Sequence, residues 1–234
     1  MTQSAAVPAV TRFTTTWGGC GVAASAVLSL VIGLPFVTAN GAAALSWYAV
    51  STVVSSIVSI AAALILAGAV SCLGFGIRGE VGLVGDSRTG RIAVLVFVAA
   101  TVVKSLVRLL FIIWSAPATI ETVVIRGYVQ AGLGAVALAS VIVAMIVVVR
   151  RGKLNRALRF GLVIVTVWTL LSQAVSYTPF VPAQPDAVFT TVLIFASNGY
   201  YVGLLLQAVL GAGIALHGQG AALRRRAAII NEHW

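Results

Sequence analysis

Long apolar stretches, separated by short polar connections, run through the whole chain. Each stretch contains about 20 or more mainly apolar residues, the length that a helix needs to cross the hydrocarbon core of a bilayer. Six such stretches occur, at residues 17–38, 47–75, 92–114, 127–149, 160–178 and 188–216. None of the six prolines falls at the centre of a stretch. The pattern predicts an all-α, polytopic integral membrane protein, a bundle of six transmembrane helices joined by short loops.

Positive charge alternates between the connections, and this alternation predicts an orientation because Lys and Arg are retained on the cytoplasmic side. Twelve of the fifteen cations lie in the first segment, two alternate connections and the tail, at Arg12, Arg78, Arg88, Arg91, Arg150, Arg151, Lys153, Arg156, Arg159, Arg224, Arg225 and Arg226. The other connections contain only Arg126. We therefore expect residues 1–16 to form a cytoplasmic N-terminal segment, 17–216 the membrane domain, and 217–234 a basic cytoplasmic tail.

Aromatic residues mark the ends of the predicted spans, as is typical of membrane interfaces. They are Trp47, Tyr48, Trp114, Tyr128, Tyr177 and Phe180 at the expected outer ends, and Trp17 and Phe160 at inner ends. The first stretch is longer than the apolar region of a typical signal peptide, so we expect it to be retained as a span. We expect the protein in the plasma (cytoplasmic) membrane of a bacterium.

The composition excludes an ordinary soluble domain. Apolar residues make up 60% of the chain and charged residues 9%, with a net charge of +10, whereas soluble domains carry about 25% charged residues. The basic residues are explained by topology and by contacts with membrane lipids, including anionic lipids at the cytoplasmic face. We therefore expect no nucleic-acid partner.

Few side chains are available for catalysis or metal binding. The chain has two His, two Cys and five carboxylates, with no Cys-x-x-Cys or His-containing ligand spacing. Cys20 and Cys72 are predicted near the cytoplasmic ends of their spans, in a reducing compartment, so a structural disulfide is not expected. His217 and His233 lie at the end of the last span and in the tail, far from any candidate nucleophile. We expect a non-enzymatic protein without cofactor or metal.

Small residues recur every fourth position in the first two spans, a pattern that marks close contacts between membrane helices. They are Gly21, Ser25, Ser29 and Gly33 in the first span and Ser51, Ser55, Ser59, Ala63, Ala67 and Ser71 in the second. Gly199 and Gly203 form a shorter pair in the last span. We expect the first two spans to pack together within one monomer; a homo-oligomer or docking on a larger membrane complex is the alternative.

Two cations lie inside the third span, where charge is unfavourable. Counted from Arg91 at about 1.5 Å per residue, Lys104 lies about 20 Å and Arg108 about 26 Å along the helix. Four residues apart, they share one face, with Thr101 and Ser105 close by. A cation at the centre of a membrane helix costs about 2.5–3.5 kcal/mol on insertion scales. Both are therefore expected to meet a polar interior, an aqueous cavity or an anionic partner.

Partners for these two cations are scarce in the sequence. No carboxylate lies in the core of a predicted span. Glu121 and Asp186 lie at outer ends, where each also suits the first turn or N-cap of a helix. The candidate ligand-binding residues are Lys104, Arg108, Gln173, Asn198, Tyr200 and Tyr201. Alternatives stay open, because Arg108 could snorkel to the outer headgroups and Lys104 could join a structural network or contact a lipid phosphate.

Two functions fit this pattern. The first is a carrier, or a membrane-embedded binding subunit, for a small anionic or zwitterionic solute, with Lys104 and Arg108 lining a water-accessible pocket in the outer half of the bilayer. The second is an accessory or scaffold subunit of a larger membrane complex, favoured by the short loops, the few titratable groups and the stripes of small residues.

Overall fold

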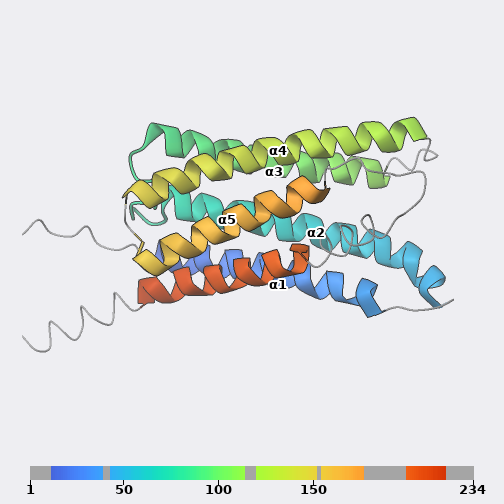
Figure 1. Ribbon diagram of the computed structural model, residues 1–234, viewed down its shortest axis with the longest axis horizontal. Helices are drawn as coiled ribbons and strands as arrows, with labels where there is room; N and C mark the ends of the chain where they lie inside the picture. Colours follow the sequence, from blue (N-terminus) through green and yellow to red (C-terminus); the bar gives the residue numbers. More distant parts are fainter. Residues whose placement is uncertain (1–11, 39–42, 114–119, 152–153, 177–198, 220–234) are drawn as a thin grey trace, which may run out of the picture.

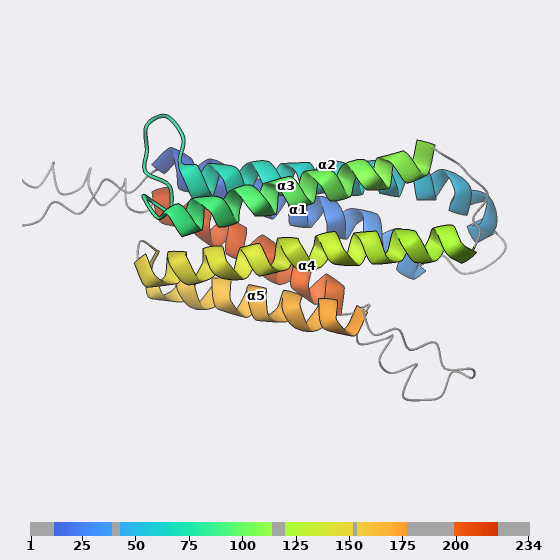
Figure 2. The same cartoon turned by 90° about the horizontal axis from the view of Figure 1, so that it is seen from above.

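The computed structural model of the protein describes residues 12–38, 43–113, 120–151, 154–176 and 199–219. Every regular element among these residues is an α-helix: α1 (Arg12–Thr38), α2 (Ala43–Phe75), α3 (Arg88–Ile113), α4 (Ile120–Arg151), α5 (Arg156–Ser176) and a C-terminal helix (Gly199–Gln219). The helices run along a common direction in two perpendicular views (Figures 1 and 2). The predicted all-α bundle is confirmed for this part of the chain.

Helices α1 to α5 are longer than the spans predicted for them. Each of α1 to α5 begins four to seven residues before its predicted span. The apolar pattern marks only the segment that suits hydrocarbon, whereas helical hydrogen bonding continues into the polar interface. The predicted span at 188–216 is described only from Gly199 onward, where its helix runs to Gln219.

Five described helices contain a segment long and apolar enough to cross a membrane. These segments are Phe13–Val31, Val54–Phe75, Arg88–Phe111, Gly127–Arg151 and Gly199–Gln219. The remaining described helix, α5, is not among these five, and its first turn contains Arg156 and Arg159. The protein therefore has the helical character of an integral membrane protein, while the count of six crossings stays a prediction.

The six helices form a closed ring in chain order. Each of α1 to α4 packs against the next helix in the sequence. The C-terminal helix contacts α5 through Trp168, whose indole N–H donates to the Gly199 carbonyl oxygen at 2.7 Å. It also contacts α1, because a Cβ added at Gly19 would lie 2.5 Å from the Ala215 backbone nitrogen. The last helix thus closes the ring onto the first (Figure 1).

Small residues of α1 make its contacts on both sides. Toward α2, the Ser25 hydroxyl donates to the Ala62 carbonyl oxygen at 2.8 Å, and a Cβ at Gly21 would lie 2.7 Å from that of Ala69. Toward the C-terminal helix, a Cβ at Gly211 would lie 2.6 Å from the Ala23 nitrogen. The predicted packing of the first two spans within one monomer is confirmed.

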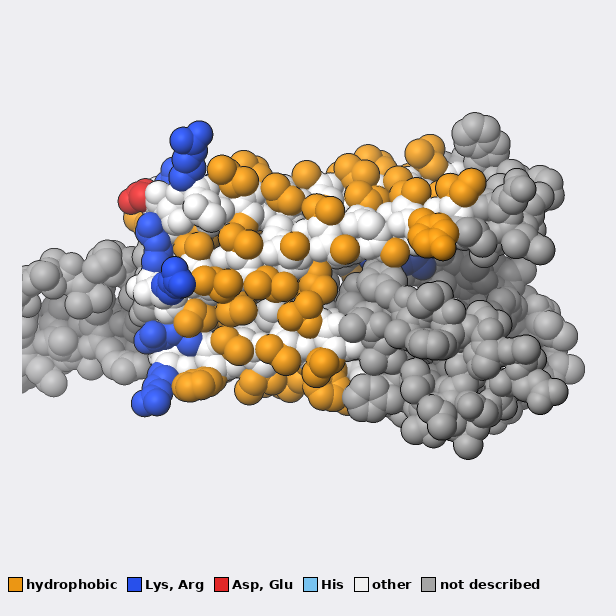
Figure 3. All heavy atoms as spheres, turned by 45° about the horizontal axis from the view of Figure 1, so that its top comes forward, with side chains coloured by type: hydrophobic (Ala, Val, Ile, Leu, Met, Phe, Trp, Pro, Cys, Tyr) orange, Lys and Arg blue, Asp and Glu red, His pale blue; other side chains and the backbone are white. Residues whose placement is uncertain are grey.

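Most described cations gather at one end of the bundle, which we call the loop end because it carries the 76–87 connection. The C-terminal helix ends there and α1 begins there (Figure 1). The cations at this end are Arg78, Arg88, Arg91, Arg150, Arg151, Arg156 and Arg159. Figure 3 shows basic side chains at this end and hydrophobic side chains along the bundle. The distribution agrees with the alternation in the sequence, while the side of the membrane that this end faces stays a prediction.

The 76–87 connection is bound to the beginning of α1. The Glu80 carboxylate accepts hydrogen bonds from the backbone N–H groups of Phe13 and Thr14, at 3.1 and 2.7 Å. The Ile77 N–H in turn donates to the Thr14 hydroxyl at 3.0 Å. The first turn of α1 has no acidic residue of its own, so Glu80 supplies the negative charge that stabilises a helix N-terminus.

Candidate functional site

A cavity of about 510 Å³ lies inside the ring, lined by residues from all six helices. This volume is within the range of about 300–1,000 Å³ that is usual for small-molecule sites. Its wall is mainly aliphatic, and its polar and charged members are Ser25, Ser29, Ser59, Thr101, Lys104, Ser105, Arg108, Gln130, Thr166, Thr169, Tyr200 and Gln207.

The third helix turns both of its internal cations into this cavity. Lys104 and Arg108 line it and are partly buried. The opposite face of α3 exposes apolar side chains, among them Leu95, Val103, Leu106 and Leu110. No carboxylate is among the described residues that line the cavity. The lining is therefore positively charged in the part of the molecule that the structure describes.

Polarity changes along the cavity. At the loop end it is lined by a buried apolar cluster, which we call the apolar floor: Val22, Leu73, Leu83, Val148, Leu154, Leu210 and Ile214. Leu83 reaches the floor because its backbone N–H donates to the Leu73 carbonyl oxygen at 2.7 Å. A Cβ on Gly82 would overlap the Gly74 carbonyl oxygen, so glycine permits this close approach. The polar residues lie in the half away from the floor.

Most hydroxyl groups of the cavity donate within their own helices. Each donates to the carbonyl oxygen four residues earlier, at 2.6–2.9 Å, and they are Ser29, Ser59, Ser105, Thr166 and Thr169. Their hydroxyl hydrogens are thus used, and their oxygen lone pairs remain as acceptors. The charged donors in the lining are the Lys104 ammonium and the Arg108 guanidinium, and Gln130, Gln207 and Tyr200 add neutral donors.

Comparisons with protein-family models, with curated proteins and with solved structures found no match for this chain. Its function therefore has to be inferred from the cavity. Among the described residues, no three His, Cys, Asp or Glu side chains come close enough to hold a metal ion. Ammonium and guanidinium groups bind anions instead, through charge-assisted hydrogen bonds.

The four neutral candidates from the sequence have different positions. Tyr200 lines the cavity and lies near Ser29 and Arg108. Tyr201 packs edge-on against the Tyr200 ring, with centroids 5.6 Å apart and planes at 72°, and is not among the lining residues. Asn198 lies outside the described residues, as do Asp186 and the side chains of Gln173 and Glu121. The structure therefore brings Lys104, Arg108 and Tyr200 together.

Gln130 is a lining residue that the sequence pattern did not single out. Its side-chain Nε2 donates to the backbone carbonyl oxygen of Lys104 at 3.4 Å, which joins α4 to α3 beside the cations. A polar side chain inside an apolar span usually faces the interior of a bundle. The position of Gln130 three residues inside the predicted fourth span carried that signal.

Proposed function

We propose that the protein is a non-enzymatic, six-span membrane protein that binds a small anionic or zwitterionic solute in its central cavity, as a carrier or a binding subunit. One observation carries the proposal: Lys104 and Arg108 line a cavity with no carboxylate among its described lining residues. Charges interact more strongly where water is partly excluded, so this cavity favours an anion.

Energetic reasoning supports a role for these cations. Each costs about 2.5–3.5 kcal/mol when placed at the centre of a membrane helix, and membrane proteins usually keep such residues where they act on a ligand or an ion. An alternative is a structural role, in which the cations hold helices together. The hydrogen bond from the Gln130 side chain, which joins α4 to α3 at this level, uses the Lys104 backbone carbonyl oxygen and not the ammonium group.

The remaining lining narrows the chemistry of the solute. Hydroxyl oxygens of Ser29, Ser59 and Thr169 offer acceptors, and the two cations offer donors. A solute that combines a negative group with a hydroxyl or ammonium group would use both. A solute that is apolar apart from its negative group would leave the acceptor oxygens unpaired, which is unfavourable in a buried site.

The apolar floor suits the outward-open state of a carrier. If the loop end is cytoplasmic, the polar half of the cavity lies in the outer half of the membrane and the floor separates it from the cytoplasm. Release to the cytoplasm would require Leu83 and Leu154, which come from the two connections at this end, to move apart.

The accessory-subunit function stays an alternative. Its support was the stripes of small residues, and in the structure Gly19, Gly21 and Gly211 contact helices of the same ring. This use within the monomer favours the solute-binding function. Purification that retains a stoichiometric partner protein in mild detergent would favour the accessory subunit.

Ligand binding to the purified full-length protein would test the proposal. The probes are phosphate, succinate, glutamate and glycine betaine, with choline as a cationic control, and the readouts are calorimetry and uptake into proteoliposomes. Replacing either cation removes a charge-assisted hydrogen bond worth about 1.5–3 kcal/mol. We therefore expect Lys104→Met and Arg108→Gln each to weaken binding of an accepted anion or zwitterion about tenfold or more.

A matched control is Arg156→Gln, which removes one positive charge at the loop end, where Arg156 stacks on the Phe160 ring at 5.8 Å. It should leave binding unchanged. Lys104→Met should also keep or raise the melting temperature, because it removes an unfavourable charge from the membrane. A large fall in melting temperature with unchanged binding would assign Lys104 to a structural network, and choline binding equal to that of the anions would overturn the proposal.

A further inference from the structure

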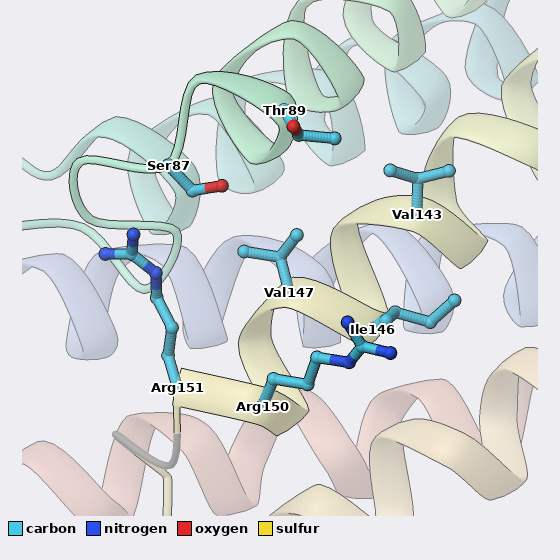
Figure 4. A pocket seen from close by; sticks show the side chains of 7 residues that line it. All are labelled: Ser87, Thr89, Val143, Ile146, Val147, Arg150 and Arg151. Atoms are coloured by element: carbon cyan, nitrogen blue, oxygen red, sulfur yellow. The ribbon is translucent and has the colours of Figure 1, made fainter.

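A second cavity, of about 380 Å³, lies at the loop end between the beginning of α3 and the last turns of α4. We call it the α3–α4 pocket; its lining residues are Ser87, Thr89, Val143, Ile146, Val147, Arg150 and Arg151 (Figure 4). None of them lines the central cavity. The pocket is therefore a separate place on the molecule, and its occupant does not depend on the function proposed above.

One side of the pocket is polar and positively charged. Arg150 and Arg151 end α4, and the Arg151 side chain extends toward Ser87 (Figure 4). The Ser87 hydroxyl accepts the Gly90 N–H at 3.2 Å, which fixes its position while leaving its own hydrogen available. The carboxylate of the adjacent Asp86 is paired with Arg91 at 3.0 Å. The Arg151 guanidinium and the Ser87 hydroxyl thus lie on one side of the pocket, while the Arg150 guanidinium lies beside Ile146 (Figure 4).

The other side of the pocket is aliphatic. Val143, Ile146, Val147 and Arg150 recur at helical spacing, so they follow one another along one face of α4. Val143 and Ile146 are 38% and 41% exposed. An exposed aliphatic strip therefore runs directly from Arg150 toward the middle of the predicted span.

We propose that the α3–α4 pocket binds one anionic phospholipid, with its phosphate at Arg151 and Ser87, an acyl chain along Val143 and Ile146, and Arg150 adding positive charge to the lining. Guanidinium groups bind phosphate oxygens in a bidentate geometry. Basic pockets between membrane helices at the cytoplasmic surface are known to hold anionic headgroups. The combination of charge and aliphatic surface distinguishes a phospholipid from a free phosphate ester, which has no chain to cover the strip.

Native mass spectrometry of the full-length protein, released from detergent micelles, would test this site. The probes are short-chain phosphatidylglycerol, phosphatidylcholine of equal chain length, and glycerol 3-phosphate. We expect one tightly bound phosphatidylglycerol, with at least about tenfold weaker binding of the other two. Arg151→Gln should weaken phosphatidylglycerol binding about tenfold, and Arg150→Gln should weaken it less, because its guanidinium lies farther from Ser87 (Figure 4).

Arg156→Gln is the matched control, because it removes one charge from the same end but lies outside the pocket. It should change the affinity by no more than about fivefold, since a general surface attraction contributes about 1 kcal/mol per charge. An equal loss in all three variants would show non-specific attraction and overturn the proposal. If glycerol 3-phosphate bound as tightly as phosphatidylglycerol, the occupant would not be a lipid. If the unaltered protein bound phosphatidylcholine as tightly as phosphatidylglycerol, the proposed site for an anionic lipid would be overturned.

Discussion

Glu80 shows how one side chain can hold two distant parts of this chain together. Its carboxylate accepts N–H groups at the beginning of α1, 66 and 67 residues earlier in the sequence. We expect Glu80→Gln to destabilise the protein by about 1–2 kcal/mol, because it removes the charge that favours a helix N-terminus and one of the two acceptor oxygens. Thermal unfolding of the purified protein in detergent would measure the loss.

Asp86→Asn is the control, since it also removes one acidic charge from the same connection. The Asp86 side chain is 90% exposed and its partner Arg91 is 51% exposed. Exposed ion pairs contribute about 0–1 kcal/mol, so this variant should unfold close to the unaltered protein. A smaller loss for Glu80→Gln than for Asp86→Asn would contradict the capping role of Glu80.

At the residue scale, the sequence is most informative where the membrane itself imposes a rule. Lys104 and Arg108 stood out because charge is unfavourable inside a span, and both line the cavity. Glu80 carried no such signal, since an acidic residue in a polar connection is ordinary and its contacts depend on how distant segments meet. Tyr201 shared the pattern of Tyr200, but the adjacent position on a helix points in another direction.

At the scale of the elements, the crossing of α1 and the C-terminal helix depends on glycine. A Cβ at Gly211 would lie 2.6 Å from the Ala23 nitrogen and 2.7 Å from the Gly19 carbonyl oxygen. Because both are backbone atoms, no side chain can give way and the helices must separate. We expect Gly211→Ala to cost about 1–3 kcal/mol, the usual range for overpacking, and to lower the melting temperature.

Gly68→Ala on α2 is the matched control, because a Cβ there would meet nothing within 4 Å. It should leave the melting temperature unchanged or slightly higher, as alanine favours the helix. Equal destabilisation by both substitutions would mean that the C-terminal helix does not approach α1 closely.

The pairing of elements was harder to predict than their existence. Apolar length was enough to find the helices, and the stripe containing Gly21 and Ser25 correctly joined α1 to α2. Gly19 and Gly211 were not predicted to meet, because small residues are abundant in every span and the pattern alone does not say which faces touch.

The whole molecule is a ring in which a cavity follows from the order of the helices. Each helix contacts its sequence neighbours, and closure by the C-terminal helix leaves a central space lined by all six. In a membrane, the polar side chains of helices usually face the interior of the bundle and not the lipid. The two cations of α3 predicted a polar interior, an aqueous cavity or an anionic partner, but the extent of the lining, including Gln130, depended on ring closure.

Orientation decides which side of the membrane the polar half of the cavity serves. We expect the loop end, with its clustered arginines, to be cytoplasmic. The test replaces Cys20 and Cys72 with alanine and adds a single cysteine, either Arg88→Cys at the loop end or Asn40→Cys in the connection after α1. A membrane-impermeant maleimide should label Asn40→Cys in intact cells, and Arg88→Cys only after the membrane is permeabilised. Labelling in the reverse order would place the apolar floor outside, and a solute would then enter the cavity from the cytoplasm.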